Sequence, residues 1–168
     1  CNPVIVGDTL YAPTPGDYLV ALDARTGKEK WRFKGEGRPA HRGLVYWPGD
    51  GTNAARLLVA IGKEIWAIHP DTGKAIETFG DGGKVTSGQA VVAGAIYKDV
   101  FVIPGYAGDV WGFDLITGAR RWTFQTRPSG DEFGADTWST TEEGANCWGG
   151  MALDEERGIA YISTGSPK

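Results

Sequence analysis

The stretch "ALDARTGKEKWRF", residues Ala21–Phe33, places a compact turn signal between two segments that suit β-strands. Apolar residues alternate before the turn, an aspartate can cap the turn's backbone, and a glycine supplies a positive φ angle. The stretch therefore predicts a β-hairpin. The same pattern returns twice without gaps, in "AIHPDTGKAIETF" (Ala67–Phe79) and "GFDLITGARRWTF" (Gly112–Phe124).

The spacing of the three hairpins indicates a repeat protein. The turn glycines Gly27, Gly73 and Gly118 lie 46 and then 45 residues apart. A period of about 40–50 residues is typical of one four-stranded propeller blade. Further strand segments precede each turn, so three strands are readable in each unit and a fourth is expected. We predict an all-β fold, a β-propeller, in which residues 1–168 form a single partial domain of about three to four blades.

The composition favours a folded chain without a nucleic-acid partner. A hydrophobic content of 41% argues against disorder, and 26 glycines suit many tight turns. The formal net charge is −4, with no long run of either sign, so there is no basic stripe for a phosphate backbone. No apolar stretch approaches the roughly 18 residues that cross a bilayer. Two cysteines give no disulfide framework, and His41 and His69 do not share a metal-binding spacing.

Large side chains are expected at the packing surfaces between neighbouring blades, called seams below. Trp31 and Trp122 each stand four residues after a turn glycine, and we interpret both as structural residues that lie across a seam. The second repeat has Glu77 at this position. We therefore expect the seam after the second repeat to lack an aromatic residue.

The segment from Gln125 to Gly150 is polar, irregular and long. Loops of this length without secondary structure are uncommon unless they are functional, so this segment is the first place to look for a site. After it, "MALDEERGIAYIST" is expected to begin another blade.

The unit A-x-D-x-x-T-G-x-x-x-W at this period resembles the pyrroloquinoline quinone (PQQ) repeat of quinoprotein dehydrogenases. Two loops extend the resemblance. "HRGLVYWPGDG" (His41–Gly51) is similar to the arginine-containing loop of methanol- and glucose-type enzymes, and "GANCWGGMALDEERGIAYISTGSP" (Gly144–Pro167) to their glycine-rich segment with a stacking tryptophan. In that family the blades close into an eight-bladed propeller with the cofactor near the axis. The resemblance implies that this chain is an excerpt of a longer protein.

The resemblance also implies a PQQ site. Arg42 is expected beside the quinone oxygens, where a guanidinium can polarise a carbonyl and stabilise developing charge. Trp148 is expected to offer its flat ring to the cofactor, with Asn146 and Cys147 in the same turn. Ser87 falls where relatives place hydroxyls against cofactor carboxylates. Without the resemblance, each residue also has a purely structural interpretation. Arg42 would be a surface arginine and Trp148 a core tryptophan between blades. Cys147 would be a small buried residue, and the Ser87 hydroxyl would bond to backbone.

The activity implied is a PQQ-dependent dehydrogenase that oxidises an alcohol, sugar or polyol by hydride transfer to the quinone. Electrons would pass to cytochrome c or ubiquinone, and the protein would be periplasmic or secreted, with membrane association left open. The general base of the family is expected beyond Lys168. The alternative is a non-catalytic propeller that serves as a protein-binding scaffold, or a lipoprotein acylated at Cys1.

The metal site of the methanol-type relatives is not matched. Those relatives hold calcium with a glutamate and with the asparagine of T-G-N-P, whereas here "VIPGYAGDVWGFD" has no glutamate and Ser166 replaces the asparagine. Calcium prefers several oxygen ligands, including anionic ones, so this site cannot be rebuilt from these residues. Asp109 is the remaining candidate ligand, and no metal ligand is assigned.

Overall fold

A computed structural model describes residues 2–138 and 145–165 of the chain. Cys1, Gly144 and Ser166, which the sequence singled out, lie outside these ranges. The described part is built almost entirely of antiparallel strands, which confirms the all-β prediction. In it, no helix is long and apolar enough to span a membrane.

Three four-stranded sheets and one two-stranded sheet follow one another along the chain, and each four-stranded sheet is one blade. Blade 1 consists of β1 (Val4–Val6), β2 (Thr9–Pro13), β3 (Leu19–Asp23) and β4 (Glu29–Phe33). Blade 2 consists of β5 (Val45–Trp47), β6 (Arg56–Ile61), β7 (Glu64–Ile68) and β8 (Lys84–Thr86). Blade 3 consists of β9 (Ala95–Tyr97), β10 (Val100–Pro104), β11 (Asp109–Asp114) and β12 (Arg120–Gln125). The two-stranded sheet pairs β13 (Met151–Asp154) with β14 (Ile159–Ile162).

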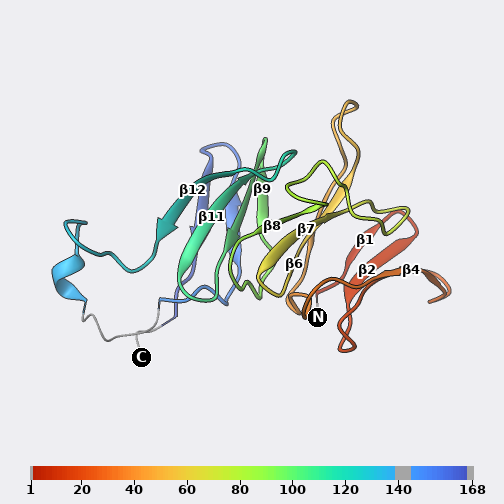
Figure 1. Cartoon of the computed structure of the whole chain (residues 1–168), viewed down its shortest axis with the longest axis horizontal. Coiled ribbons are helices and arrows are strands. Elements are labelled where there is room, and N and C mark those ends of the chain that lie inside the picture. Colours follow the sequence, from red (N-terminus) through yellow and green to blue (C-terminus); the bar gives the residue numbers. More distant parts are fainter. Residues whose placement is uncertain (1, 139–144, 166–168) are drawn as a thin grey trace.

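Blades 1 to 3 stand side by side along the long axis of the molecule, and the β13–β14 sheet overlaps blade 3 in this view (Figure 1). Within each blade the strands pair in chain order, and the first strand of blade 3, β9, contacts both β5 and β13. The first strands therefore lie toward one common side, as in an arc of propeller blades. A short 3-10 helix, Ala135–Thr137, lies in the long loop after β12 and projects from one end.

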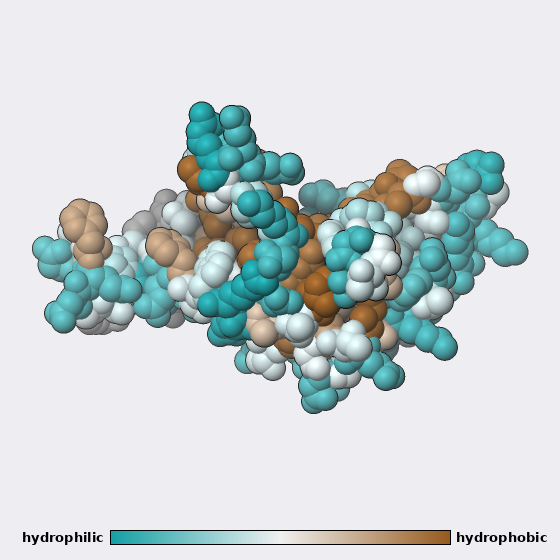
Figure 2. All heavy atoms as spheres, turned by 90° about the horizontal axis from the view of Figure 1, so that it is seen from above, coloured by the Kyte–Doolittle hydropathy of each residue, from teal (hydrophilic) through white to brown (hydrophobic). Residues whose placement is uncertain are grey.

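The core lies in the seams. All six residues of β6 are buried, since its side chains alternate between the two neighbouring blades. Leu57, Val59 and Ile61 pack in one cluster with residues of blade 1, while Leu58 and Ala60 pack in another with residues of blade 3. From above, hydrophobic residues form a band between hydrophilic loops (Figure 2).

The repeat turns are closed by local hydrogen bonds. In blade 1 the Gly27 N–H donates to the Asp23 carbonyl at 2.8 Å, and the Asp23 carboxylate accepts from the Thr26 N–H at 2.8 Å. Asp114 makes the same pattern in blade 3, with the Thr117 N–H at 2.8 Å. In blade 2 the acceptor is the imidazole Nδ1 of His69, and the donor is the Asp71 N–H at 3.2 Å. The glycine at the end of each turn has a positive φ, as predicted.

The predicted hairpin is wrong for the second repeat. After the Gly73 turn the chain makes only an isolated bridge, Ile68 to Ala75, and then turns away. Gly80, Gly82 and Gly83 all have positive φ and redirect the backbone. The outer strand of blade 2 is β8 instead, which forms after this glycine cluster.

The prediction for Trp31 is confirmed, whereas the prediction of a seam without an aromatic residue is wrong. The Trp31 ring lies under the Gly73 turn, 2.6 Å from where a Cβ of Gly73 would stand. Under the Gly118 turn lie the Phe79 ring and the Val85 side chain. Phe79 is fully buried and Glu77 is exposed, because the chain turns at a different point than in the other repeats.

Candidate functional site

Arg42 is held by two chain segments that run side by side. The segment before β5 forms a parallel bridge between Arg42 and Val92, and the Arg42 N–H donates to the Val91 carbonyl at 3.2 Å. Gly43 follows with φ 129°, and a Cβ there would lie 3.2 Å from the Cβ of Ala93. The close approach of the two segments fixes the backbone from which the Arg42 side chain extends.

Trp148 is positioned by the end of the long loop. The Thr126 hydroxyl donates to the Ala145 carbonyl at 2.9 Å, and the Gly165 N–H donates to the Asn146 carbonyl at 2.9 Å. Cys147 is fully buried in a cluster with Val102 and Val110. The neighbouring Trp148 side chain, by contrast, is partly exposed.

Arg42 and Trp148 are in direct contact although 106 residues separate them. The guanidinium carbon lies 5.2 Å from the centroid of the indole ring, a cation–π geometry. Arg42 Nη1 also donates a hydrogen bond to the Trp148 carbonyl. Trp148 is 48% exposed, so it is not a core tryptophan between blades.

Two cavities, of about 540 and 460 Å³, adjoin this pair, and both are lined by His41, Arg42 and Trp148. The remaining lining residues of the first are Asn2, Val92, Ala93, Gly94, Gly149, Gly150 and Met151. Those of the second are Val91, Tyr106, Asn146 and Gly165. Among these described residues there is one guanidinium and no carboxylate. The lining therefore suits a flat, anionic molecule better than a cation.

The structure brings together three of the five predicted site residues, Arg42, Asn146 and Trp148, around these cavities. Cys147 lies behind them in the core, where burial raises the pKa of its thiol, so the group is held neutral. Ser87 lines neither cavity: its hydroxyl is within hydrogen-bond distance of the Gly88 and Lys63 carbonyls, at 2.9 and 3.3 Å. The proposed contacts of Ser87 and Cys147 with a cofactor stay predictions.

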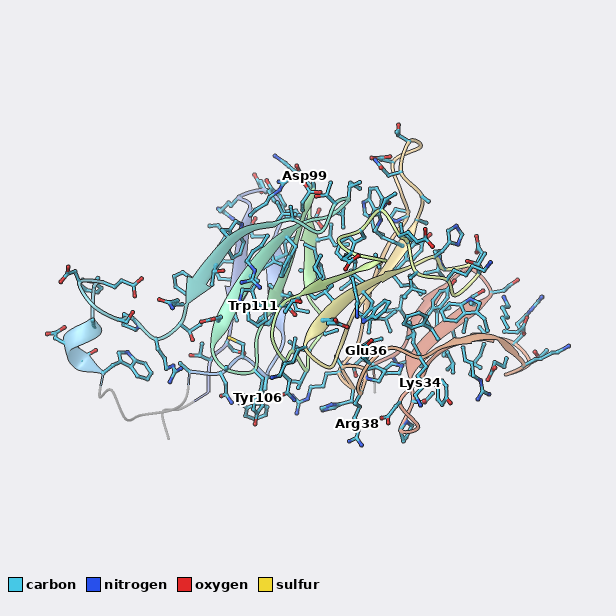
Figure 3. The ribbon with its side chains drawn as sticks, viewed as in Figure 1. Lys34, Glu36, Arg38, Asp99, Tyr106 and Trp111 are labelled. Atoms are coloured by element: carbon cyan, nitrogen blue, oxygen red, sulfur yellow. The ribbon has the colours of Figure 1, made fainter. Side chains whose placement is uncertain are left out.

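Three further residues at the cavities were not predicted to form part of a site. His41 opens the loop that resembles the family's arginine-containing loop but was interpreted as an ordinary loop histidine, and Tyr106 carries no sequence signal. Tyr106 is 45% exposed and lies at the opposite edge of the sheets from Asp99 (Figure 3). Gly165 is the glycine of the sequence T-G-S-P, which stands where the relatives have T-G-N-P. A Cβ at Gly165 would lie 2.7 Å from Asn146 Oδ1 and 2.9 Å from Trp148 Nε1. A glycine is needed for this close approach.

These observations test how well the residues fit PQQ and a metal. A planar quinone that bears carboxylates matches an exposed indole face, a guanidinium and a glycine-lined floor. A methanol-type calcium site does not fit, since Asp109, the candidate ligand, lines neither cavity. Asp109 lies in β11, where its backbone pairs with that of Gln125 in β12. Over residues 2–138 and 145–165, no cluster of three or more histidine, cysteine, aspartate or glutamate side chains could hold a metal ion.

Comparison with known proteins identifies the family of the chain. The chain matches the family described as "PQQ: Glucose/ethanol/alcohol dehydrogenase, beta-propeller domain" over residues 1–89 and 84–168. The chain therefore belongs to the PQQ β-propeller family of quinoprotein dehydrogenases.

The relatives are distant and much longer. Quinoprotein glucose dehydrogenase A of Acinetobacter calcoaceticus is 25% identical over 98% of this chain, which spans 26% of that protein. The structure of quinohemoprotein alcohol dehydrogenase from Comamonas testosteroni superimposes with a TM-score of 0.76 at 20% identity, covering 99% of this chain and 29% of its own. BamB from Moraxella catarrhalis superimposes with a TM-score of 0.56 at 19% identity, over 93% of this chain and 46% of its own. The last two show a shared fold.

Proposed function

We propose that this chain supplies part of the PQQ-binding wall of a dehydrogenase that oxidises an alcohol, sugar or polyol. The observation that carries the proposal is the contact between Arg42 and Trp148 at two cavities whose described lining residues include no carboxylate. Membership of the PQQ propeller family supports it at the level of the cofactor.

Each residue has a role that follows from its chemistry. PQQ, when bound, supplies a quinone that accepts a hydride from the substrate carbon. Arg42 would hold an anionic or carbonyl oxygen through its fixed charge and several N–H donors. Trp148 would stack on the ring, and Asn146 would donate or accept a hydrogen bond at the ring's edge. Gly165 acts as a positioning residue, because it leaves room for Asn146 and Trp148.

The setting of the reaction is also a proposal. Electrons would pass to cytochrome c or ubiquinone, in the periplasm or outside the cell. The substrate class and the acceptor rest on the family and on no residue described above.

The second candidate function is a PQQ-repeat scaffold that binds proteins and performs no chemistry. The observation that favours it is that none of the described residues lining the two cavities offers an anionic ligand to a metal. The fold it shares with BamB is compatible with this candidate.

Binding of PQQ separates the two candidates, because it does not require the complete catalytic machinery. We expect equilibrium dialysis of the protein against PQQ, with and without Ca²⁺, to show saturable binding. Arg42→Ala and Trp148→Ala should each weaken binding at least about tenfold, the loss of about 1.4 kcal/mol that one charged or stacking contact contributes.

The matched control is Arg38→Ala. Arg38 is an exposed arginine whose ion pair, with Asp17 at 3.3 Å, lies away from the cavities, and its loss should leave PQQ affinity unchanged. The proposal fails if the protein does not bind PQQ, or if Arg42→Ala binds it as tightly as the parent protein. If PQQ bound equally well to the Arg42→Ala and Trp148→Ala variants, its site would lie elsewhere on the protein.

A further inference from the structure

We propose that Thr126 is a positioning residue, which holds a strained backbone turn at Ala145 and thereby fixes Trp148 at the candidate site before any ligand binds. Neither Thr126 nor Ala145 lines the two cavities of the site. The proposal rests on the proposed function only for the identity of the ligand, because the contacts that carry it are made within the protein.

The segment 145–148 depends on other parts of the chain for its position. It forms neither helix nor strand, although it carries two of the residues that line the cavities. Three of its four carbonyls accept hydrogen bonds from three separate segments, which follow β12, follow β14 and precede β5. The donors are the Thr126 hydroxyl, the Gly165 N–H and the Arg42 guanidinium, and the acceptors are the carbonyls of Ala145, Asn146 and Trp148.

Ala145 carries backbone strain at the start of this segment. Its φ is 50°, in the left-handed region that residues with a side chain rarely adopt. Asp17 and Lys98, the other described residues of this kind apart from glycines, lie in turns between adjacent strands, whereas Ala145 is only 4% exposed. A strained residue persists only where its surroundings hold it. Relaxation of Ala145 would therefore redirect the chain that leads to Trp148.

The Thr126 hydroxyl is the strongest donor that holds Ala145. It lies within hydrogen-bond distance of two carbonyls, those of Ala145 and Gly108, which share its single proton. The Gly108 carbonyl also accepts from the Thr126 N–H at 3.2 Å. The Cys147 thiol, at 4.0 Å from the Ala145 carbonyl, is a weak donor. Loss of the hydroxyl would thus leave Gly108 with a partner and deprive Ala145 of its main one.

Thr126 also connects two parts of the smaller cavity. Gly108 belongs to the turn between β10 and β11 that carries Tyr106, and Tyr106 lines this cavity together with Asn146 and Trp148. Through its two carbonyl contacts, Thr126 joins the turn that carries Tyr106 to the segment that carries Trp148. A link of this kind preorganises a site, because less ordering is then required when a ligand binds.

The test removes the hydroxyl and then relieves the strain. Thr126→Val keeps the shape of the side chain and removes its donor. Ala145→Gly relieves the strain, because glycine adopts a positive φ readily. If Thr126 acts by holding a strained turn, Ala145→Gly should restore in the Thr126→Val protein what the valine removed. Thr126→Ser, which keeps the hydroxyl, should behave like the parent protein.

The matched control is Thr137→Val. The Thr137 hydroxyl also donates to a backbone carbonyl, that of Gly134 at 2.6 Å, but both residues belong to the same short turn of the long loop. Neither lines a cavity of the site. Thr137→Val should therefore leave both measurements below unchanged.

The first measurement needs no ligand. It follows the indole N–H signal of Trp148 in ¹⁵N-labelled protein, assigned with Trp148→Phe. We expect Thr126→Val to shift or broaden this signal, and the double variant with Ala145→Gly to return it to its parent position. Dispersed amide signals verify that the blades remain folded, and Thr126→Ala replaces Thr126→Val if the valine variant does not fold.

The second measurement is equilibrium dialysis against PQQ. Thr126→Val should weaken binding about fivefold, as expected for the loss of one hydrogen bond, and the double variant should recover to within about twofold of the parent protein.

Two results would overturn the proposal. One is a Thr126→Val protein with the parent Trp148 signal. The other is a double variant that stays as altered as Thr126→Val, since the strain at Ala145 would then have no part in the effect. If the parent protein binds no PQQ, the proposed function fails, and the Trp148 signal alone decides the role of Thr126.

Discussion

The two internal seams solve one packing problem with different residues. Between blades 1 and 2, the single side chain of Trp31 fills the space under the turn glycine and donates a hydrogen bond to the turn carbonyl. Between blades 2 and 3 these tasks are divided. Phe79 and Val85 fill the space under Gly118, and Arg56 donates to the carbonyls of Leu115 and Ile116 at 3.0 and 3.1 Å.

In the seam between blades 2 and 3 the hydrogen-bond donor is a buried charge, which needs neighbouring groups to stabilise it. Arg56 is only 2% exposed, and its guanidinium lies 5.2 Å from the centroid of the Trp47 ring. Burial lowers the pKa of Arg56, and the nearby Asp50 and Asp114 carboxylates counteract this. A repeat can thus lose its tryptophan when an apolar group and a separate donor replace it. What is retained is the pair of interactions and not the residue.

The largest effect is expected at Phe79, the residue that distinguishes the second seam. Phe79→Ala should lower the free energy of unfolding by about 3–5 kcal/mol, because it removes a fully buried ring. Glu77→Ala is the matched control, since Glu77 holds the tryptophan position in the aligned repeat but is exposed. It should change stability by less than about 0.5 kcal/mol.

Urea unfolding followed by circular dichroism measures both values. If Glu77→Ala proved as costly as Phe79→Ala, the repeat alignment would describe the second seam better than the structure does. Equal and small effects would mean that this seam does not limit stability.

A second comparison measures what a docked turn adds to a free one. Gly73 and Gly27 stand at the same position of their turns with φ 68° and 72°, so alanine meets the same backbone strain at both. A Cβ at Gly73 would lie 2.6 Å from the Trp31 ring, whereas nothing lies within 4 Å at Gly27. Gly73→Ala should therefore be more destabilising than Gly27→Ala by about 1–3 kcal/mol, the cost of overpacking.

The two variants are compared by urea unfolding under identical conditions. Equal losses would show that the Trp31 ring moves aside without cost, and that the first seam is held by other contacts.

The fold could be predicted from the sequence because each repeat contains clear strand and turn signals. Alternating apolar residues and the Asp-x-x-Thr-Gly turn predicted β3, β4, β11 and β12 in their correct order. The second repeat misled, since its alignment continued through Ala75–Phe79 while the glycines at 80, 82 and 83 set the backbone path. Local propensity outweighed similarity to the other repeats there.

The candidate site was predicted only in part, and that prediction came from family resemblance and not from strand and turn signals. Resemblance to a family selected Arg42 and Trp148, and their contact depends on the way that separate blades face a common side. His41, Tyr106 and Gly165 were missed because cavity lining is a property of packing. Ser87 was placed by analogy, and its hydrogen bonds to nearby backbone depend on a local path that no spacing reveals.

The docked turn of blade 3 and the free turn of blade 1 also differ in the electrostatic surroundings of their aspartates. Partial burial would raise the pKa of the Asp114 carboxyl, but hydrogen bonds from the Thr117 N–H and the Arg121 guanidinium outweigh this and lower it from 3.8 to about 2. Arg121 lies 2.5 Å from Asp114 and 2.6 Å from Asp99, and these bonds raise its pKa. Asp23 in the free turn of blade 1 is also partly exposed and has a lowered pKa, mainly through hydrogen bonds from Thr26, but among the described residues it forms no ion pair like that of Asp114 with Arg121.

This difference predicts a smaller, pH-dependent effect. Because the pKa of Asp114 is lower in the folded state, its contribution is complete above about pH 4 and is lost as the pH falls toward 2. The loss is about 2 kcal/mol at most. Asp114→Asn should remove this part of the acid sensitivity, whereas Asp23→Asn should leave most of it in place, in urea unfolding measured between pH 2 and 5. The reverse order would mean that charge at the free turn, and not at the docked one, limits stability in acid.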